Sequence, residues 1–276
     1  MTNIAVHYRN TYDEFGSLLA YAVNLLEMQA GQKPENDREF YAERIFNKLV
    51  CHGLTLKQLS PSPPPASDIE FWDISSSYAI ARALIESYEA LAYVALEPIT
   101  DEERVFRILL WELHAEERRQ QMLELVGAKD IKVSEVIANV LRLRNEILIN
   151  PFLSTLDSKL TSEIQKGKTP PYHLTNAERD KNNGINNNYH RAITMHLSSY
   201  VHTHPFSVHQ LFQFRAGEDE CLQLMSIPIQ YSCGFIAKSI SGMASLFDPR
   251  IPVQSNELLN ALDQWGKLHA NGAKAS

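Results

Sequence analysis

Apolar residues recur three and four positions apart through most of the 276-residue chain, and this spacing is the feature that most constrains its fold. The clearest example runs from Asp73 to Leu96, where Tyr78, Ile85 and Tyr88 belong to one such series. This spacing places side chains on one face of an α-helix, whereas a half-buried strand requires strict alternation. No stretch of the sequence alternates in that way. The sequence therefore predicts an all-α protein, a bundle of long antiparallel helices with an N-terminal helical arm.

Capping and breaking residues divide this pattern into separate helices. Thr100 and Glu103 form a capping box, Gly127 ends the helix that they begin, and Pro151 interrupts the next one. A weaker amphipathic segment reaches Gly167, and a polar loop is expected over 168–188. The predicted helices are 9–31, 36–50, 73–96, 100–127, 134–150, 189–202, 207–214, 219–246 and 255–269.

A proline-rich segment suggests where the chain divides. Four of the thirteen prolines fall between residues 61 and 65, and such a run is stiff and extended. We expect the N-terminal arm to dock on the core without forming its centre. The predicted parts are a helical arm over 1–60, a linker over 61–68, a helical core over 69–250, and a C-terminal helix and tail over 251–276.

The sequence favours a cytoplasmic protein with no membrane partner. The N-terminus lacks a basic segment followed by an apolar run, so no signal peptide is expected. The most apolar stretch, 221–247, is interrupted by polar residues and Pro228, which predicts a buried helix rather than a bilayer span. An odd number of cysteines without a CxxC pair argues against disulfides and a structural zinc site. The cysteines are Cys51, Cys221 and Cys233.

Arg82, Glu86 and Glu89 form the first candidate polar site. Their spacings of four and seven place them on one helical face, beside the apolar stripe. Three interpretations stay open: an Arg82–Glu86 pair at the surface, a buried structural network, and a functional site. We expect Arg82 and Glu86 to be buried together near His202, because both lie beside the apolar stripe; buried there, the two charges must pair with each other.

Histidines provide the second candidate site, since five of the ten fall within twenty residues. His202 and His204, with His209 or a carboxylate such as Glu86, could supply three ligands to a metal ion. No histidine has a glutamate three residues before it, so a ferritin-like dimetal centre is not expected. We expect capping or core roles for these histidines and no metal or other cofactor. The five are His190, His196, His202, His204 and His209.

Arg191 and His196, in the segment HRAITMH, form the third candidate. Their spacing resembles the motif of HEPN ribonucleases, an arginine followed by histidine after four to six residues. The resemblance implies a homodimer that cleaves RNA without a metal, with Arg191 holding the scissile phosphate and His196 transferring protons. Ala192 departs from the polar residue usual after the arginine, and helical geometry places His196 about 140° from Arg191.

A second resemblance covers roughly residues 70–215. The segments DISSSYAIARALIESYEALAYV, FRILLWELHAEERRQQ and HLSSYVHTHPFS resemble an uncharacterised family of bacterial helical proteins, a domain of unknown function. The resemblance implies a helical intracellular fold and a shared polar network, but no activity. The matching positions are Arg82, Glu86, Ser198, Ser199 and His202.

These observations lead to a main functional hypothesis and two alternatives. The main hypothesis is a catalytic pair, Arg191 and His196, in a metal-independent RNA-cleaving effector of a bacterial defence or toxin system. The alternatives are a non-catalytic interaction or sensor subunit with an apolar groove, and a metal-dependent hydrolase using the His202 region. We expect RNA, a second copy of the chain or a partner protein as binding partners. Four arginines could also form a local basic patch, although a solvated surface is the simpler expectation: Arg118, Arg119, Arg142 and Arg144.

Overall fold

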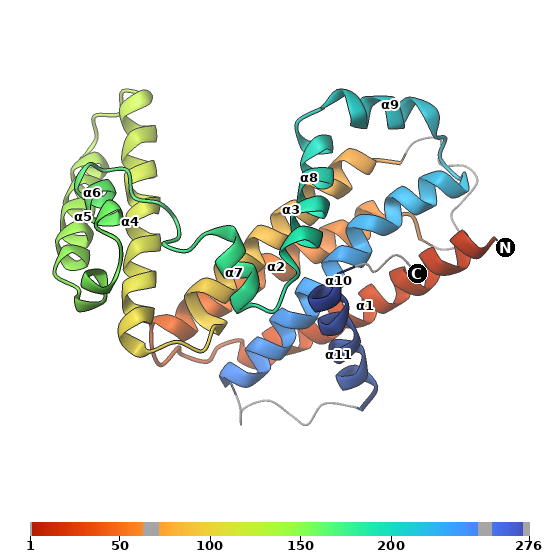
Figure 1. The fold of residues 1–276 in the computed structure, drawn as a ribbon, viewed down its shortest axis with the longest axis horizontal. Helices are drawn as coiled ribbons and strands as arrows, with labels where there is room; N and C mark the ends of the chain where they lie inside the picture. Colours follow the sequence, from red (N-terminus) through yellow and green to blue (C-terminus); the bar gives the residue numbers. More distant parts are fainter. Residues whose placement is uncertain (1, 63–71, 248–255, 273–276) are drawn as a thin grey trace. The chain divides into compact units, whose positions relative to one another are not determined.

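The computed structural model describes residues 2–62, 72–247 and 256–272, and these ranges contain helices and no strand. The predicted all-α class is confirmed (Figure 1). A π-helical segment, Ala92–Leu96, follows α3, and a 3₁₀ helix, Pro151–Thr155, follows α5. The α-helices are α1 (Asn3–Gln29), α2 (Asp37–Leu59), α3 (Ile74–Leu91), α4 (Asp101–Leu125), α5 (Ile131–Leu148), α6 (Ser158–Gln165), α7 (Asn176–Asn182), α8 (Asn187–Val201), α9 (Pro205–Gln213), α10 (Asp219–Phe247) and α11 (Asn256–Asn271).

Most predicted helices are present, with boundaries that differ for identifiable reasons. The Thr100 hydroxyl accepts a hydrogen bond from the Glu103 amide, so the predicted cap does begin α4. The sequence predicts a helix over 36–50 that ends before Gly53, but α2 continues through this glycine, nine residues beyond the predicted end. A side chain at Gly53 would overlap Leu19, which shows that this glycine allows α1 and α2 to approach closely. The loop expected over 168–188 contains α7.

The chain forms two compact units, which are residues 1–92 with 180–276, and residues 93–179. The division expected at the proline-rich segment, 61–68, does not coincide with these boundaries. Residues 63–71 of that region lie outside the described residues, as do 248–255 and 273–276. Each unit has a hydrophobic core of its own.

In the first unit, the two N-terminal helices belong to the core. α1 packs along α10 and α2 packs along α3 (Figure 1). Phe15 and Phe46 are fully buried, like Phe235 of α10, so residues 1–60 contribute to the centre of this unit and do not merely dock on it. α10 is buried over most of its length, as expected of a core helix. No helix in the described ranges is long and apolar enough to cross a membrane.

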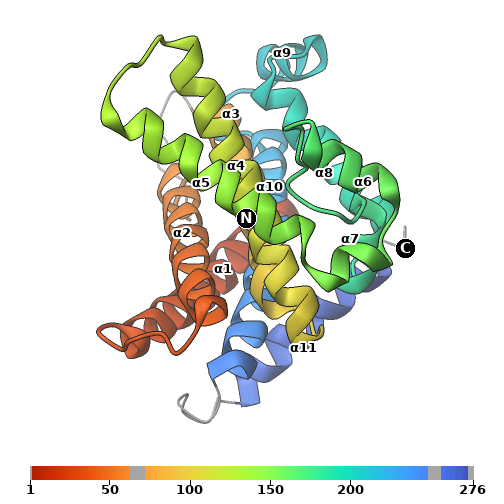
Figure 2. The same ribbon diagram turned by 90° about the vertical axis from the view of Figure 1, so that its left-hand side faces the viewer.

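The second unit is built around the antiparallel pair α4 and α5, which Figure 2 shows lying side by side. The apolar faces of these helices meet, and the 3₁₀ helix and α6 cover part of the same core. The buried side chains of this core include Phe106, Leu110, Val140, Ile147 and Ile164.

Candidate functional site

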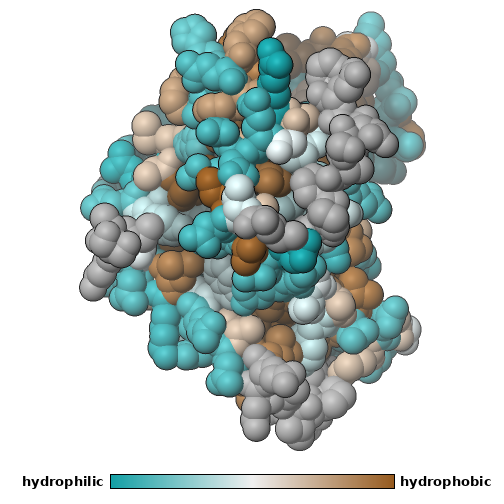
Figure 3. Space-filling model, turned by 90° about the vertical axis from the view of Figure 1, so that its right-hand side faces the viewer, coloured by the Kyte–Doolittle hydropathy of each residue, from teal (hydrophilic) through white to brown (hydrophobic). Residues whose placement is uncertain are grey.

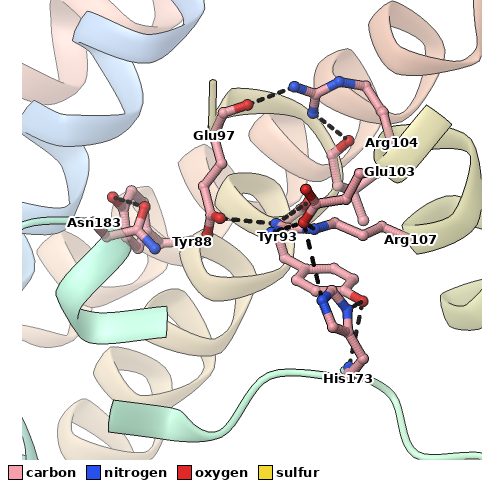
Figure 4. Close-up of polar contacts among 9 residues, drawn as sticks. Tyr88, Tyr93, Glu97, Glu103, Arg104, Arg107, His173 and Asn183 are labelled. Atoms are coloured by element: carbon pink, nitrogen blue, oxygen red, sulfur yellow. Dashed lines mark hydrogen bonds and ion pairs between the residues drawn. The ribbon is translucent and has the colours of Figure 1, made fainter. Parts of the chain in front are cut away.

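A buried charged cluster surrounds Arg107 in the second unit (Figure 4). The Arg107 side chain is 1% exposed and forms ion pairs with Glu97 at 2.8 Å and Glu103 at 2.6 Å. It also donates a hydrogen bond to the backbone carbonyl of Tyr93. Arg104 donates to the carbonyls of Val94 and Glu97. The two guanidinium groups thus satisfy carbonyls at the end of the π-helical segment, where a helix leaves such groups without intrahelical partners.

His173 completes this cluster from the segment before α7. Its Nδ1 lies 2.8 Å from the Tyr93 hydroxyl, and its Nε2 lies 3.9 Å from Glu103. Burial, together with the positive charge of Arg107, lowers the pKa of His173 to about 4. The imidazole is therefore neutral at neutral pH. The two guanidinium groups balance the charges of the two glutamates, and the main donors have partners. We therefore interpret the cluster as a structural clamp between α4 and the residues that precede it.

A second buried polar centre lies in the first unit, where His190 of α8 contacts residues of α7 and α3. His190 Nδ1 lies 2.6 Å from Asp180 Oδ1, and Asn187 donates to the other oxygen of the same carboxylate. His190 Nε2 faces Glu89 Oε1 at 3.5 Å. The side chains of His190 and Asp180 are 7% and 6% exposed. The centre therefore joins three helices through one imidazole ring.

Several polar atoms of this centre lack a hydrogen-bond partner within the described residues. They are His190 Nε2, Thr194 Oγ1 one turn later on α8, and the Tyr231 hydroxyl of α10. The rings of Tyr231 and His190 are 6.1 Å apart, and burial raises the pKa of Tyr231. A carboxylate-oriented imidazole beside a phenol is suited to proton transfer. Side chains that are more than nine-tenths buried cannot meet a substrate without local opening, so the geometry favours a structural role.

The structure places Arg82 and Glu86 at the edge of this centre. They form an ion pair of 3.0 Å, but their side chains are 26% and 56% exposed. The expectation that the pair is buried is therefore wrong, and the alternative of a surface ion pair describes it better. The reason is that Glu86 lies on the solvent-facing side of α3, which leaves the pair in contact with water. Arg82 still lies near enough to Tyr231 for its positive charge to oppose the rise in the pKa of that phenol.

Arg191 and His196 lie on different faces of α8. Arg191 is exposed, whereas His196 is half-buried and contacts the rings of Tyr78 and Phe206. Burial lowers the pKa of His196, so its imidazole is neutral at neutral pH. His196 lines a groove to which Arg191 does not contribute. A single chain thus does not bring the two side chains to one phosphate.

The histidines after His196 lie where α8 ends and the chain turns into α9. His202 is the residue that caps the C-terminus of α8 and is exposed, which fits the expected capping role and not a core role. Its ring lies 5.8 Å from that of His204, while His209 is exposed on α9. Within the described residues no three metal-ligating side chains converge. Ser198 lines the groove instead of joining Arg82 in a buried network.

The groove has a volume of about 750 Å³ and lies between α8, α9 and α10. The surface that it presents is mostly carbon, from Phe206, Phe214, Leu224 and Ile227 among others. His196, His204 and Gln210 supply polar groups. Among the described residues, Glu220 is the one lining side chain with a permanent charge, and neither lysine nor arginine lines the groove. Such a site suits an apolar occupant better than a polyanion.

The Arg107 clamp and the Asp180–His190 pair are buried polar centres that sequence reasoning missed. Glu103 and Arg107 are four positions apart, which is a signal for an ion pair but not for burial. Asp180 lies in a segment whose composition predicts a loop, so nothing in the sequence pointed to its carboxylate as a partner of His190. Comparisons with family models, curated proteins and solved structures give no match.

Proposed function

We propose that this chain is a non-catalytic interaction subunit whose α8–α10 groove binds an apolar helix of a partner protein. The observation that supports this most is the groove's wall of mostly carbon, which is open on its outer side. Leu224 and Ile227 are three positions apart on α10 and both line the groove, so this helix contributes a short apolar strip to its wall. Helix-binding grooves accept side chains spaced three, four and seven positions apart, which matches a strip of this kind.

The exposure of α9 supports the same interpretation. Phe206 lines the groove and is 53% exposed, while Leu211 and Phe212 are 41% and 86% exposed. Several large apolar side chains exposed on one short helix mark a surface that another structure normally covers. Figure 3 shows apolar side chains in several places between hydrophilic ones on the face that it presents. Because Glu220 adds a negative charge to the groove, we expect the partner helix to carry a lysine or arginine beside its apolar face.

Selection of helical peptides against the purified chain tests this proposal. Selected peptides should be amphipathic, and Phe206→Ser should weaken their binding at least tenfold, because the peptide loses the exposed aromatic side chain that it would cover. Phe212→Ser is the matched control, since Phe212 lies on the same helix but does not line the groove. Equal weakening by both variants, or no effect of Phe206→Ser, would contradict binding in the groove.

RNA cleavage by a HEPN-like dimer is the second candidate function, in a bacterial defence or toxin system. It is favoured by the lowered pKa of His196, which provides a neutral imidazole at an open groove. Because Arg191 lies on another face of α8 than His196, this function requires a second copy of the chain to bring an arginine to His196. We place such an effector in the cytoplasm, where reducing conditions keep the three free cysteines as thiols.

Cleavage assays in the presence of EDTA distinguish the two candidates. A HEPN-like enzyme should cleave RNA without divalent ions, and His196→Ala should lower the rate by roughly 10²–10⁴ through loss of proton transfer. The Arg191→Ala variant should lose activity as well, and mixing the two variants should restore part of it across the dimer. A folded chain that cleaves none of several RNA substrates leaves the interaction subunit as the function.

A further inference from the structure

We propose that the second unit binds the phosphate group of a small molecule, such as a mononucleotide, in a polar cleft beside α4. The cleft has a volume of about 510 Å³. One wall is the face of α4 that carries His114, Glu117 and Arg118. Arg144 of α5 and the short segment Gly167–Lys168–Thr169 complete it. This site is separate from the α8–α10 groove and does not depend on the function proposed for it.

The cleft is held in shape by bonds to the backbone of Thr169. Glu117 Oε2 accepts a hydrogen bond from the Thr169 amide at 3.0 Å, and His114 Nδ1 lies 2.7 Å from the Thr169 carbonyl oxygen. The other oxygen of Glu117 pairs with Arg144 at 2.8 Å. Gly167 turns the chain with a φ of +67°, next to the Arg144 guanidinium. The segment is therefore fixed against α4 before any ligand arrives.

Two polar atoms of residues that line the cleft lie beneath its surface, closed off from solvent, and have no hydrogen-bond partner within the described residues. Thr169 is 4% exposed, yet its hydroxyl is unpaired, and the Arg144 Nε is also buried without a partner. Buried polar atoms in native proteins nearly always find partners, so two unpaired donors in one cleft require an explanation. Both residues line the same space. A phosphate bound against this wall would bring acceptor oxygens within reach of both atoms after a small rotation of the Thr169 and Arg144 side chains.

The charge of the cleft favours an anion despite the acidic chain. Arg144 neutralises Glu117, whereas the hydrogen bond that Glu124 accepts from Gln120 does not cancel the charge of that carboxylate. Arg118 and Lys168 are exposed and also line the cleft, so its charged side chains, with those of Arg144, Glu117 and Glu124, carry a net charge of +1. A guanidinium, an ammonium and a hydroxyl are together the donors typical of phosphate sites. The volume falls within the range of about 300–1,000 Å³ for small-molecule sites, which favours an organic phosphate over the free ion.

Calorimetric titration of the full chain with AMP, inorganic phosphate and adenosine tests the proposal. AMP should bind, phosphate should compete with it, and adenosine should bind at least tenfold more weakly. Equal affinity for AMP and phosphate would still support a phosphate site and identify the free ion as its ligand. Adenosine binding as tightly as AMP, or no binding of AMP and phosphate, would overturn the proposal.

Variants locate the binding in this cleft. Thr169→Val removes the unpaired hydroxyl, and Lys168→Ala removes an exposed ammonium without disturbing the Glu117–Arg144 pair, so each should weaken AMP binding about tenfold. Lys166→Ala and Arg142→Ala are matched controls, because neither residue lines the cleft and Arg142 pairs with Glu146. Unchanged affinity in both test variants, with thermal melts like those of the controls, would show that AMP binds elsewhere and refute the site.

Discussion

His190 Nδ1 lies 2.6 Å from the carboxylate of Asp180, and both side chains are more than nine-tenths buried. The pair joins the end of α7 to the start of α8, while the opposite ring nitrogen faces Glu89 of α3. Polar contacts of this one imidazole ring thus connect three helices. Removing one member of such a pair leaves the other buried without its partner, which costs more than the pair itself contributes.

The first prediction concerns this pair. Asp180→Ala should lower the free energy of unfolding by roughly 3 kcal/mol, because it leaves the buried ring of His190 without its acceptor. Urea denaturation followed by circular dichroism measures the change. Asp263→Ala is the control, since Asp263 is 58% exposed and should change stability by less than about 0.5 kcal/mol. Similar midpoints for the two variants would show that the Asp180–His190 bond is not important for stability.

The second prediction compares two ion pairs with the same spacing. Glu103 and Arg107 are four positions apart, as are Arg82 and Glu86. Arg107→Ala should cost roughly 3–5 kcal/mol, because Glu97 and Glu103 would both lose the buried cation with which they pair. Glu86→Ala should cost less than about 1 kcal/mol, because exposed pairs contribute little. Urea denaturation of both variants provides the test, and a larger loss for Glu86→Ala would reverse the assignment of buried and exposed pairs.

These two pairs show how far sequence reasoning reaches in this protein. The periodic spacing of apolar residues identifies the helices, because a helix shows it whenever one of its faces is buried, whatever buries that face. The all-α fold class follows from the helices. Burial of a given charged side chain depends on segments distant in sequence. His173, which packs near Arg107, follows it by 66 positions and lies in a segment without periodicity. Likewise, Gly53 resembles a stop signal in the sequence, because its close contact with α1 cannot be inferred locally.

The third prediction concerns pH. The pKa of His173 is about 4 in the folded chain and 6.5 in the unfolded chain, so between these values the unfolded state binds more protons. The stabilisation is complete above pH 6.5 and decreases as the pH falls toward 4. When the pH is lowered from 7 to 5, the titration of this histidine should lower the free energy of unfolding by about 2 kcal/mol.

His173→Gln isolates this contribution, because it removes the titrating ring and retains a polar group near the Tyr93 hydroxyl. Urea denaturation at pH 7 and pH 5 should show a smaller loss of stability in the variant than in the native chain. His269, whose pKa burial lowers to about 3, contributes equally in both proteins and cancels in the comparison. Equal losses would mean that the His173 ring is not protected from protonation.

The last prediction concerns the packing of α11 on α10. A Cβ atom at Gly234 would overlap the His269 ring, which is also held between Tyr231 and Phe235. Because the ring is 1% exposed and closely packed, Gly234→Ala should displace α11 and cost roughly 1–3 kcal/mol.

Gly266→Ala is the control on α11, because a Cβ atom there meets nothing within 4 Å among the described residues. The higher helix propensity of alanine should raise the stability of this control by up to about 1 kcal/mol. Adding His269→Ala to Gly234→Ala should recover much of the loss, since the small side chain makes room for the new methyl group. If the loss of stability in the double variant equals the sum of the losses in the two single variants, the overlap with His269 is not the cause of the destabilisation by Gly234→Ala.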